Sequence, residues 1–145
     1  MNRFQTLVAA AATLFALPVW ADSAIQINDA YARTMGGVGA SGAVFLGIMN
    51  QGAEEDHLIG AKSDAAERVE IHTHKEDANG VMQMLHLEEG LPIPAGSEHL
   101  LQRGGDHVMM MGLTQELKDG DMVTVTLIFE KAGEIVIEVP LDNAR

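Results

Sequence analysis

The chain has 145 residues, 47% of them hydrophobic, a formal net charge of −12 and no cysteine. This length and hydrophobic content suffice for one packed domain. The lack of thiols excludes a disulfide framework and any thiolate metal site, and the acidic charge disfavours nucleic acid as a partner, because phosphate binding needs clustered Lys and Arg. Any ligand must therefore be held by His, Met, carboxylate or backbone groups.

Residues 1–21 predict a secretory signal peptide. A basic residue, Arg3, precedes an apolar run from Leu7 to Leu17, and small residues lie before a cleavage site after Ala21. The apolar run is shorter than the roughly 20 residues that span a bilayer, so a retained membrane anchor is the weaker interpretation. Cleavage would leave residues 22–145 as a single exported domain without a membrane span. That domain would carry eight Lys and Arg against 21 Asp and Glu, a net charge near −13.

The rest of the chain has the pattern of short β-strands. Gly, Asn, Asp and Pro clusters separate nine runs, at 25–33, 41–52, 57–63, 67–74, 80–87, 98–103, 107–113, 121–130 and 134–141. Alternation of apolar and polar residues is clearest in "VTVTLIF" (123–129) and "IVIEV" (135–139). Their near-regular spacing, without a long segment of helical period, predicts an all-β sandwich or small barrel of about eight or nine strands.

The segment "VEIHTHKEDANGVMQMLH" (69–86) predicts a β-hairpin that carries metal ligands. Turn-forming residues at 77–80 centre the turn near Ala78, which would set His72 opposite Met84 and His74 opposite Met82. Because side chains alternate along a strand, all four would project from one face of the hairpin. Two imidazoles and two thioethers would then share one surface.

The segment "GGDHVMMMGL" (104–113) predicts a second part of the same site. Alternation places His107, Met109 and Met111 on one face of this run. If the run folds beside the hairpin, the set His72, Met84, His107 and Met109 forms a site of nitrogen and thioether ligands. Thioethers bind hard cations poorly and suit monovalent copper, so the sequence favours Cu(I).

Each residue also has an ordinary structural explanation. Methionine in a strand is usually core filler, and a lone His is more often a surface residue than a ligand. Zinc remains an alternative, bound by His72, His74 and His107 with a carboxylate, although that set leaves the methionines unexplained. An enzyme is not expected, because no nucleophile elbow or paired-carboxylate motif is present.

A family resemblance adds to these observations. The segments "DAYARTM", "SGAVFLGIMNQG", "SDAAERVEIHTH", "LPIPAG" and "GGDHVMMMGL" resemble successive blocks of the periplasmic copper chaperone family PCu(A)C. The likeness runs from about residue 29 to residue 140. The metal motif of that family, an upstream His and Met followed by His-x-Met, falls on His72, Met84, His107 and Met109. The interval between Met84 and His107 holds 22 residues, one more than the family pattern, in a predicted loop.

The resemblance implies a cupredoxin-like Greek-key β-sandwich in the periplasm that binds one Cu(I) per chain. It further implies a monomer that delivers copper to an acceptor, such as a cytochrome oxidase subunit or another copper assembly factor. Two alternatives remain: copper buffering or resistance without a dedicated acceptor, and an adhesive or interaction module that binds no metal. Electron transfer at a blue-copper centre is excluded, because such a centre needs a Cys thiolate.

Several further residues lie near the predicted site. We expect His86 to face Glu70 across the hairpin as an ion pair rather than to bind metal. Met35, in the Gly-rich loop "RTMGGVGASG" (33–42), is a candidate accessory ligand. The sequence leaves open whether Met35, His74, Met82 or Met111 contributes.

Overall fold

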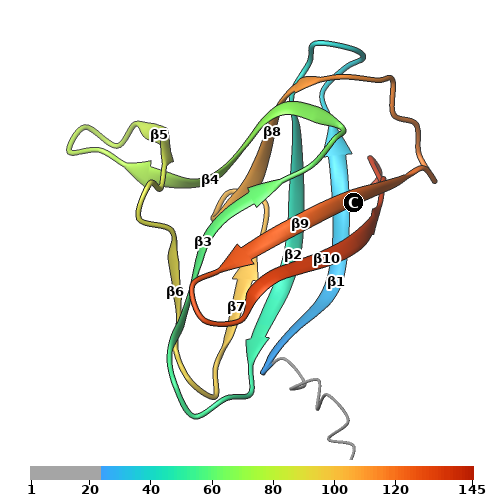
Figure 1. The fold of residues 1–145 in the computed structure, drawn as a ribbon. Coiled ribbons are helices and arrows are strands. Elements are labelled where there is room, and N and C mark those ends of the chain that lie inside the picture. Colours follow the sequence, from blue (N-terminus) through green and yellow to red (C-terminus); the bar gives the residue numbers. More distant parts are fainter. Residues whose placement is uncertain (1–23) are drawn as a thin grey trace, which may run out of the picture.

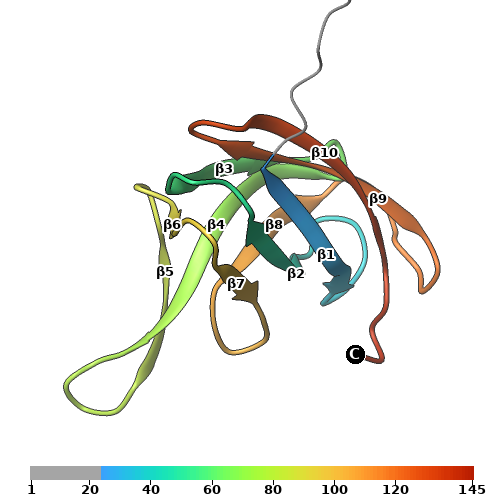
Figure 2. The ribbon, with the colours of Figure 1, turned by 90° about the horizontal axis from the view of Figure 1, so that it is seen from below.

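The computed structural model describes residues 24–145 (Figures 1 and 2), so the predicted signal peptide lies outside the described residues. Within this range the chain forms ten β-strands and no helix. The described residues therefore contain no helix that is long and apolar enough to cross a membrane. The strands are β1 (Ile25–Thr34), β2 (Gly42–Asn50), β3 (Asp56–Lys62), β4 (Ala66–Glu76), β5 (Met82–His86), β6 (Leu91–Ile93), β7 (Glu98–Leu101), β8 (His107–Leu113), β9 (Met122–Phe129) and β10 (Gly133–Pro140).

Nine of these strands correspond to the nine predicted runs, and β6 is the strand that the sequence pattern missed. It has only three residues, and the middle one is Pro92. Proline cannot donate to a ladder and is confined to sheet edges, which is where β6 lies, beside β3. A run this short carries no alternation that could identify it.

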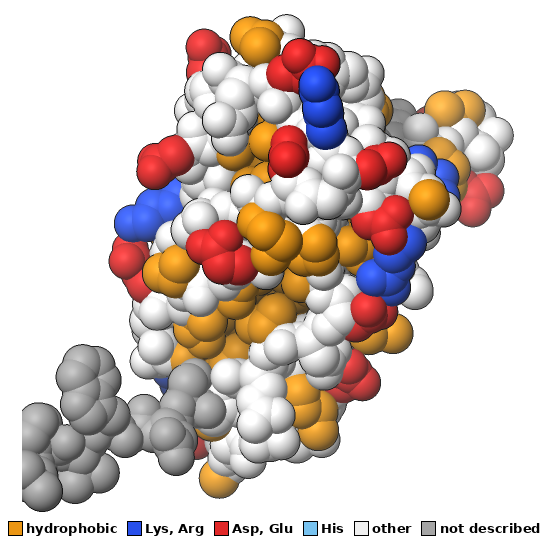
Figure 3. Space-filling view, turned by 90° about the vertical axis from the view of Figure 1, so that its right-hand side faces the viewer, with side chains coloured by type: hydrophobic (Ala, Val, Ile, Leu, Met, Phe, Trp, Pro, Cys, Tyr) orange, Lys and Arg blue, Asp and Glu red, His pale blue; other side chains and the backbone are white. Residues whose placement is uncertain are grey.

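The strands form two antiparallel sheets that pack face to face. The larger has the order β1-β2-β8-β4-β5, with β7 beside the other half of β2, and the smaller has the order β10-β9-β3-β6. Along one side the sheets approach through a bridge between Ala32 and Leu141. The side of the molecule on the right of Figure 1, where β1 and β10 lie, presents a strip of hydrophobic side chains among Asp and Glu (Figure 3).

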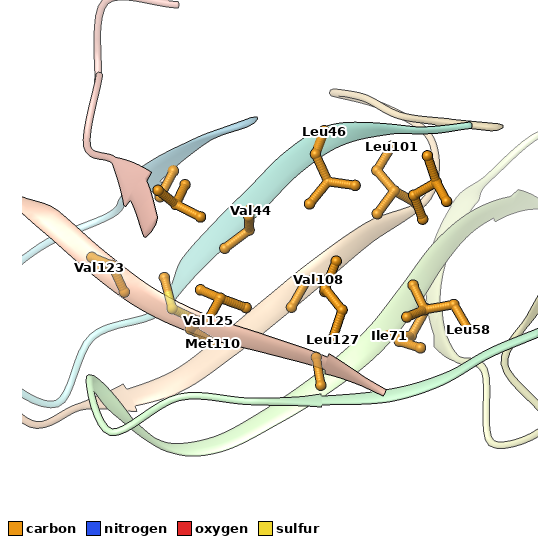
Figure 4. Packing of buried hydrophobic residues seen from close by; sticks show 14 of the residues in the cluster. Val44, Leu46, Leu58, Ile71, Leu101, Val108, Met110, Val123, Val125 and Leu127 are labelled. Carbon is orange, nitrogen blue, oxygen red and sulfur yellow. The ribbon is translucent and has the colours of Figure 1, made fainter. Parts of the chain in front are cut away.

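The core fills the space between the sheets (Figure 4). In β9 the alternation predicted by "VTVTLIF" is observed, because Val123, Val125, Leu127 and Phe129 are buried while Thr124 is exposed. The all-β sandwich prediction is therefore confirmed, and the small barrel is not the fold.

The central strands of the larger sheet have two different faces. In β8, Val108 and Met110 point into the core, and Met109 therefore lies on the opposite, outer face. In β4, Ile71 is likewise a core residue, which directs His72 to the same outer face. The hairpin formed by β4 and β5 continues beyond the body of the sandwich in both ribbon views (Figures 1 and 2).

The predicted register of this hairpin is wrong by two residues. His72 faces His86 instead of Met84, and His74 faces Met84 instead of Met82. Because side chains alternate with a period of two, this even shift leaves the same residues on the same face. The predicted shared face is therefore confirmed, while the predicted partners are corrected.

The turn itself explains the shift. The backbone N–H of Asp77 donates to the carbonyl of Val81 at 2.9 Å, and the Asp77 carboxylate accepts the N–H groups of Asn79 and Val81 at 2.8 and 3.0 Å. Gly80 sits inside this turn at φ +79°, a conformation that favours glycine. The side chain of Asp77 thus closes a turn centred on Asn79, one residue beyond the predicted centre at Ala78.

Candidate metal centre

Three histidines form a row across three neighbouring strands on the outer face of the larger sheet. His72 in β4 pairs with His86 of β5 on one side and with His107 of β8 on the other. The ring centroid of His72 lies 5.7 Å from that of His86 and 5.9 Å from that of His107. The expectation that residues 107–113 fold beside the hairpin is confirmed.

The methionines flank this row. Met84 pairs with His74, and Met109 pairs with Glu70, so each is a diagonal neighbour of His72. Diagonal neighbours are typically about 7–8 Å apart, within reach of long side chains. The four predicted ligands therefore lie on one face of the sheet, with His72 and His107 in one row and one thioether on either side of that row.

His72 has one nitrogen with a hydrogen bond and one without. Its Nε2–H donates to Oε2 of Glu70 at 2.8 Å, and the side chain is 12% exposed. Its Nδ1 is buried and has no hydrogen-bond partner among the described residues. Since the carboxylate can only accept, the proton belongs on Nε2, and Nδ1 carries a free lone pair. A buried acceptor without a partner is rare in proteins, and a metal ion is one group that would satisfy it.

His107 presents the complementary arrangement. Its Nδ1–H donates to the carbonyl oxygen of Gly105 at 3.0 Å, which leaves the lone pair on Nε2. The residue is 3% exposed, and burial lowers the pKa of its imidazole below the ordinary value, although the Gly105 hydrogen bond opposes the shift. The nearby His74 and His72 lower this pKa further. His107 is thus held neutral, the form in which imidazole binds metals.

Glu70 connects the imidazoles to a charge network. The hydrogen bond from His72 lowers the pKa of the Glu70 carboxyl; burial opposes this, and His86 and Arg68 add to it. Its Oε2 also lies 3.6 Å from Nδ1 of His86, and its Oε1 lies 2.9 Å from Nε of Arg68. An ionised carboxylate behind a metal-binding imidazole fixes the ring and raises its basicity. The predicted contact between His86 and Glu70 is present at 3.6 Å, but the prediction that His86 directly faces Glu70 is wrong, because His86 faces His72.

The two methionines differ in exposure. Met109 is 9% exposed and packs against Ala43 and Phe45 in a small cluster on the outer face. The Phe45 ring lies 6.1 Å from that of His107, centroid to centroid. Met84 is 44% exposed, on a strand whose residues are all exposed. One thioether is therefore fixed in a packed wall, and the other is open to solvent.

The residues that the sequence left open lie in different places. His74 is beside the row, 5.3 Å from His107 between ring centroids, and its Nδ1 lies 3.3 Å from the Gly105 carbonyl. Met111 packs against the cluster of Met109 on the side away from the histidines. Met82 is 55% exposed at the end of the hairpin, and Met35 is 70% exposed and lines a separate pocket.

The zinc alternative has less support in this geometry. Across residues 24–145, no three His, Asp or Glu side chains are arranged so that they could hold a metal ion. A site of His and carboxylate ligands would also leave Met84 and Met109, on the same face as His72 and His107, without a role.

Sequence reasoning named Glu70 only as a partner of His86 and missed its hydrogen bond with His72, and it missed Phe45 altogether. Glu70 lies two positions before His72 and therefore on the same face, which was the available signal for its role. Phe45 comes from β2, and only the pairing of Ala43 with Met109 brings it to the site. No local pattern reveals that contact.

Comparison with known proteins identifies the family. The model of the LpqE-like family, described as putative lipoprotein LpqE-like, matches residues 25–141. The putative lipoprotein Lxx21020 of Leifsonia xyli subsp. xyli (strain CTCB07) is 32% identical over 119 residues, which are 82% of this chain and 70% of that protein.

Solved structures identify the fold. A copper-bound PCuAC domain from PmoF2 has a TM-score of 0.66 at 24% identity, over 82% of this chain and 92% of that domain. The solution structure of CuI-DR1885 from Deinococcus radiodurans has a TM-score of 0.61 at 25% identity, over 85% and 83% of the two chains. The predicted cupredoxin-like β-sandwich is thereby confirmed. The chain belongs to the LpqE-like family, which has the PCuAC type of domain and is not a family of enzymes.

Proposed function

We propose that this protein is a copper chaperone that binds one Cu(I) through His72, Met84, His107 and Met109 and passes it to an acceptor protein. The observation that carries the proposal is the buried, partnerless Nδ1 of His72 on a ring that neighbours the ring of His107, with one thioether on either side of this pair. The copper-bound structures of similar PCuAC domains support the choice of metal.

The donor set suits a carrier. Two imidazoles and two thioethers are neutral, soft or borderline ligands that favour Cu(I) over hard cations. Because Met84 is exposed and Met109 is packed, an incoming ligand would replace Met84 first while the other donors keep the ion. Exchange one ligand at a time allows delivery without release of free copper.

The direct test is an anaerobic Cu(I) titration of residues 22–145 against a competing chelator of known affinity. A carrier takes up one tight equivalent, and an adhesive module takes up none. A His72→Ala/His107→Ala double variant serves as the control, since it should lose the tight equivalent. Binding of two or more equivalents of Cu(I) with equal affinity would contradict the proposed site. Unchanged Cu(I) uptake by the double variant would also contradict it.

The acceptor and the location belong to the same proposal. We propose export to the periplasm with cleavage after Ala21, and delivery to a cytochrome oxidase subunit or another copper assembly factor. The name of the matched lipoprotein family supports export. A deletion strain separates delivery from buffering: loss of oxidase activity that added copper restores indicates delivery, and copper sensitivity with normal oxidase activity indicates buffering.

We expect Cu(I) to bind far more tightly than Zn(II). Two of the four proposed donors are thioethers, which Zn(II) uses poorly, whereas both metals accept imidazole. Competition titrations of the same protein with each metal measure the difference. A Zn(II) affinity equal to or above the Cu(I) affinity would contradict the proposed donor set.

We expect His74→Ala and Met82→Ala to weaken Cu(I) binding much less than His72→Ala or Met84→Ala. Met82 lies at the exposed end of the hairpin, and His74 lies outside the row formed by His72, His86 and His107. Chelator competition on the four single variants gives the comparison. Equal losses in all four would mean that the wrong residues of the hairpin have been chosen.

A further inference from the structure

Arginine has an uneven distribution over this acidic protein. The four arginines of residues 24–145 all lie on the side of the larger sheet that carries the candidate metal centre: Arg33, Arg68, Arg103 and Arg145. Arg33 pairs with Ala43 and Arg68 with Met111, and both partners belong to the outer-face cluster. Lys62 in β3 of the smaller sheet pairs with Glu134, and Lys131, just after β9, pairs with Glu54.

Two of these arginines are neutralised by carboxylates. Arg68 pairs with Glu70 at 2.9 Å. Arg145 pairs with Asp29 at 2.8 Å and lies over the Tyr31 ring, 4.1 Å from its centroid. These two guanidiniums are therefore committed within the protein and contribute little free positive charge.

Arg33 and Arg103 are different. Arg33 donates to the backbone oxygen of Asn143 at 3.2 Å, and Arg103 to that of Arg145 at 3.4 Å. Among the described residues neither forms an ion pair with a carboxylate side chain. In a chain with a net charge of −12, two neighbouring guanidiniums that no Asp or Glu side chain pairs with can still bind a carboxylate from another molecule.

Both arginines line one pocket of about 240 Å³, whose other lining residues are Thr34, Met35, Ala43 and Phe45. Its apolar side is formed by Ala43 and Phe45, which also pack against Met109. The pocket thus shares a wall with the candidate metal centre. A group bound there would be held next to one of the proposed metal ligands.

We propose that this pocket receives a carboxylate side chain from an acidic segment of the protein that accepts Cu(I). The inference rests on the proposed function. Arginine binds carboxylates through paired hydrogen bonds of fixed geometry, which gives orientation as well as attraction. Docking at the pocket would hold the acceptor beside Met109 while its own ligands replace the exposed Met84.

The test uses a defined acceptor, a synthetic peptide with two cysteine thiolates flanked by aspartates, and a matched peptide flanked by lysines. Stopped-flow spectroscopy follows Cu(I) transfer from the loaded protein at low and high salt. Fluorescence anisotropy measures binding of each peptide to the metal-free protein. The variants are Arg33→Gln/Arg103→Gln and, as a control with the same change of net charge, Lys62→Gln/Lys131→Gln.

We expect the arginine double variant to transfer Cu(I) to the aspartate-flanked peptide about tenfold more slowly at low salt, because opposite charges accelerate association. Cu(I) affinity should stay unchanged, and the lysine control should behave like the wild type. The charge-reversed Arg33→Glu/Arg103→Glu variant should instead bind the lysine-flanked peptide better. Equal transfer and binding by both double Gln variants would overturn the proposal.

The two proposals fail in different ways. If the wild-type protein binds no Cu(I), the proposed function fails, and the anisotropy measurement on the metal-free protein still decides whether the pocket docks acidic peptides. If Cu(I) binds as proposed but the arginine variants change nothing, only the docking site is wrong. If those variants alter only self-association in sedimentation experiments, the pocket binds the acidic surface of a second copy, which also contradicts the acceptor proposal.

Discussion

Replacing either proposed imidazole ligand should lower the Cu(I) affinity by more than about a hundredfold, because removing only a hydrogen-bond partner of a metal ligand already costs about 10- to 100-fold. The residues to change are His72 and His107, each to Ala, with affinities measured by anaerobic chelator competition. His72 offers the buried Nδ1 without a partner, and His107 is neutral and almost fully buried. Each variant should remain folded, since both residues lie outside the core between the sheets.

Glu70→Gln provides the graded comparison. An amide can still accept the hydrogen bond from His72 but carries no negative charge, so the loss should lie within the range of about 10- to 100-fold rather than beyond it. His86→Ala is the matched control on the same face, because His86 is exposed and its nitrogen is 3.6 Å from Glu70. A loss for His86→Ala as large as that for His72→Ala would mean that the metal lies between β4 and β5 instead of between β4 and β8.

Much of the fold could be predicted from the sequence because burial on one side of a strand leaves an alternating pattern. The alternation in "VTVTLIF" and "IVIEV" predicted two strands and the face on which each of their side chains lies. The same rule predicted correctly which residues of 107–113 lie on each face of β8. The strand β6 carries no such pattern and was missed. Alternation predicts the face on which a side chain lies, but a strand of three residues such as β6 is too short to show an alternating pattern.

The hairpin shows where the pattern gives the face but not the partner. Register depends on which residue closes the turn, and here the Asp77 carboxylate accepts two backbone N–H groups and fixes a turn centred one residue later than predicted. Side-chain capping of this kind is one of several options that the same turn-forming residues allow. The face of His72 and Met84 was therefore predictable, whereas the pairing of His72 with His86 was not.

The candidate site divides in the same way. The set His72, Met84, His107 and Met109 follows from spacing and resemblance, and the fold brings these residues onto one surface. The features that suggest how they work are the Glu70 hydrogen bond, the free Nδ1 of His72 and the pocket beside Met109. These three features depend on which strands are neighbours and on how deeply each imidazole ring is buried. A local sequence pattern reveals neither the strand order nor the burial.

Cu(I) affinity should fall steeply as the pH drops through the histidine range. A proton and Cu(I) compete for the same imidazole lone pair, whereas the thioethers of Met84 and Met109 have no proton to gain near neutrality. Above the ordinary histidine pKa of about 6.5 the affinity should be nearly constant. Below it, the slope of log affinity against pH should rise toward about 2, one proton for each imidazole.

The structure adds a distinction between the two histidines and their carboxylate. Burial lowers the pKa of His107, so protons should displace Cu(I) from this ring only at a pH below the ordinary histidine value. The hydrogen bond from His72 lowers the pKa of Glu70, so Glu70 stays ionised throughout this window and adds nothing to the slope. The contribution of His107 to the slope should therefore begin below the ordinary histidine value.

The measurement is a Cu(I) competition series from mildly acidic to mildly alkaline pH, with a chelator whose own protonation is known. In the His107→Ala variant the limiting slope should decrease from about 2 to about 1, because one competing proton is removed together with its ligand. A profile that is flat in the wild type would exclude both imidazoles from the metal. A variant that keeps the wild-type slope would exclude His107 alone and leave the second nitrogen donor to its neighbour His74, whose ring centroid lies 5.3 Å away.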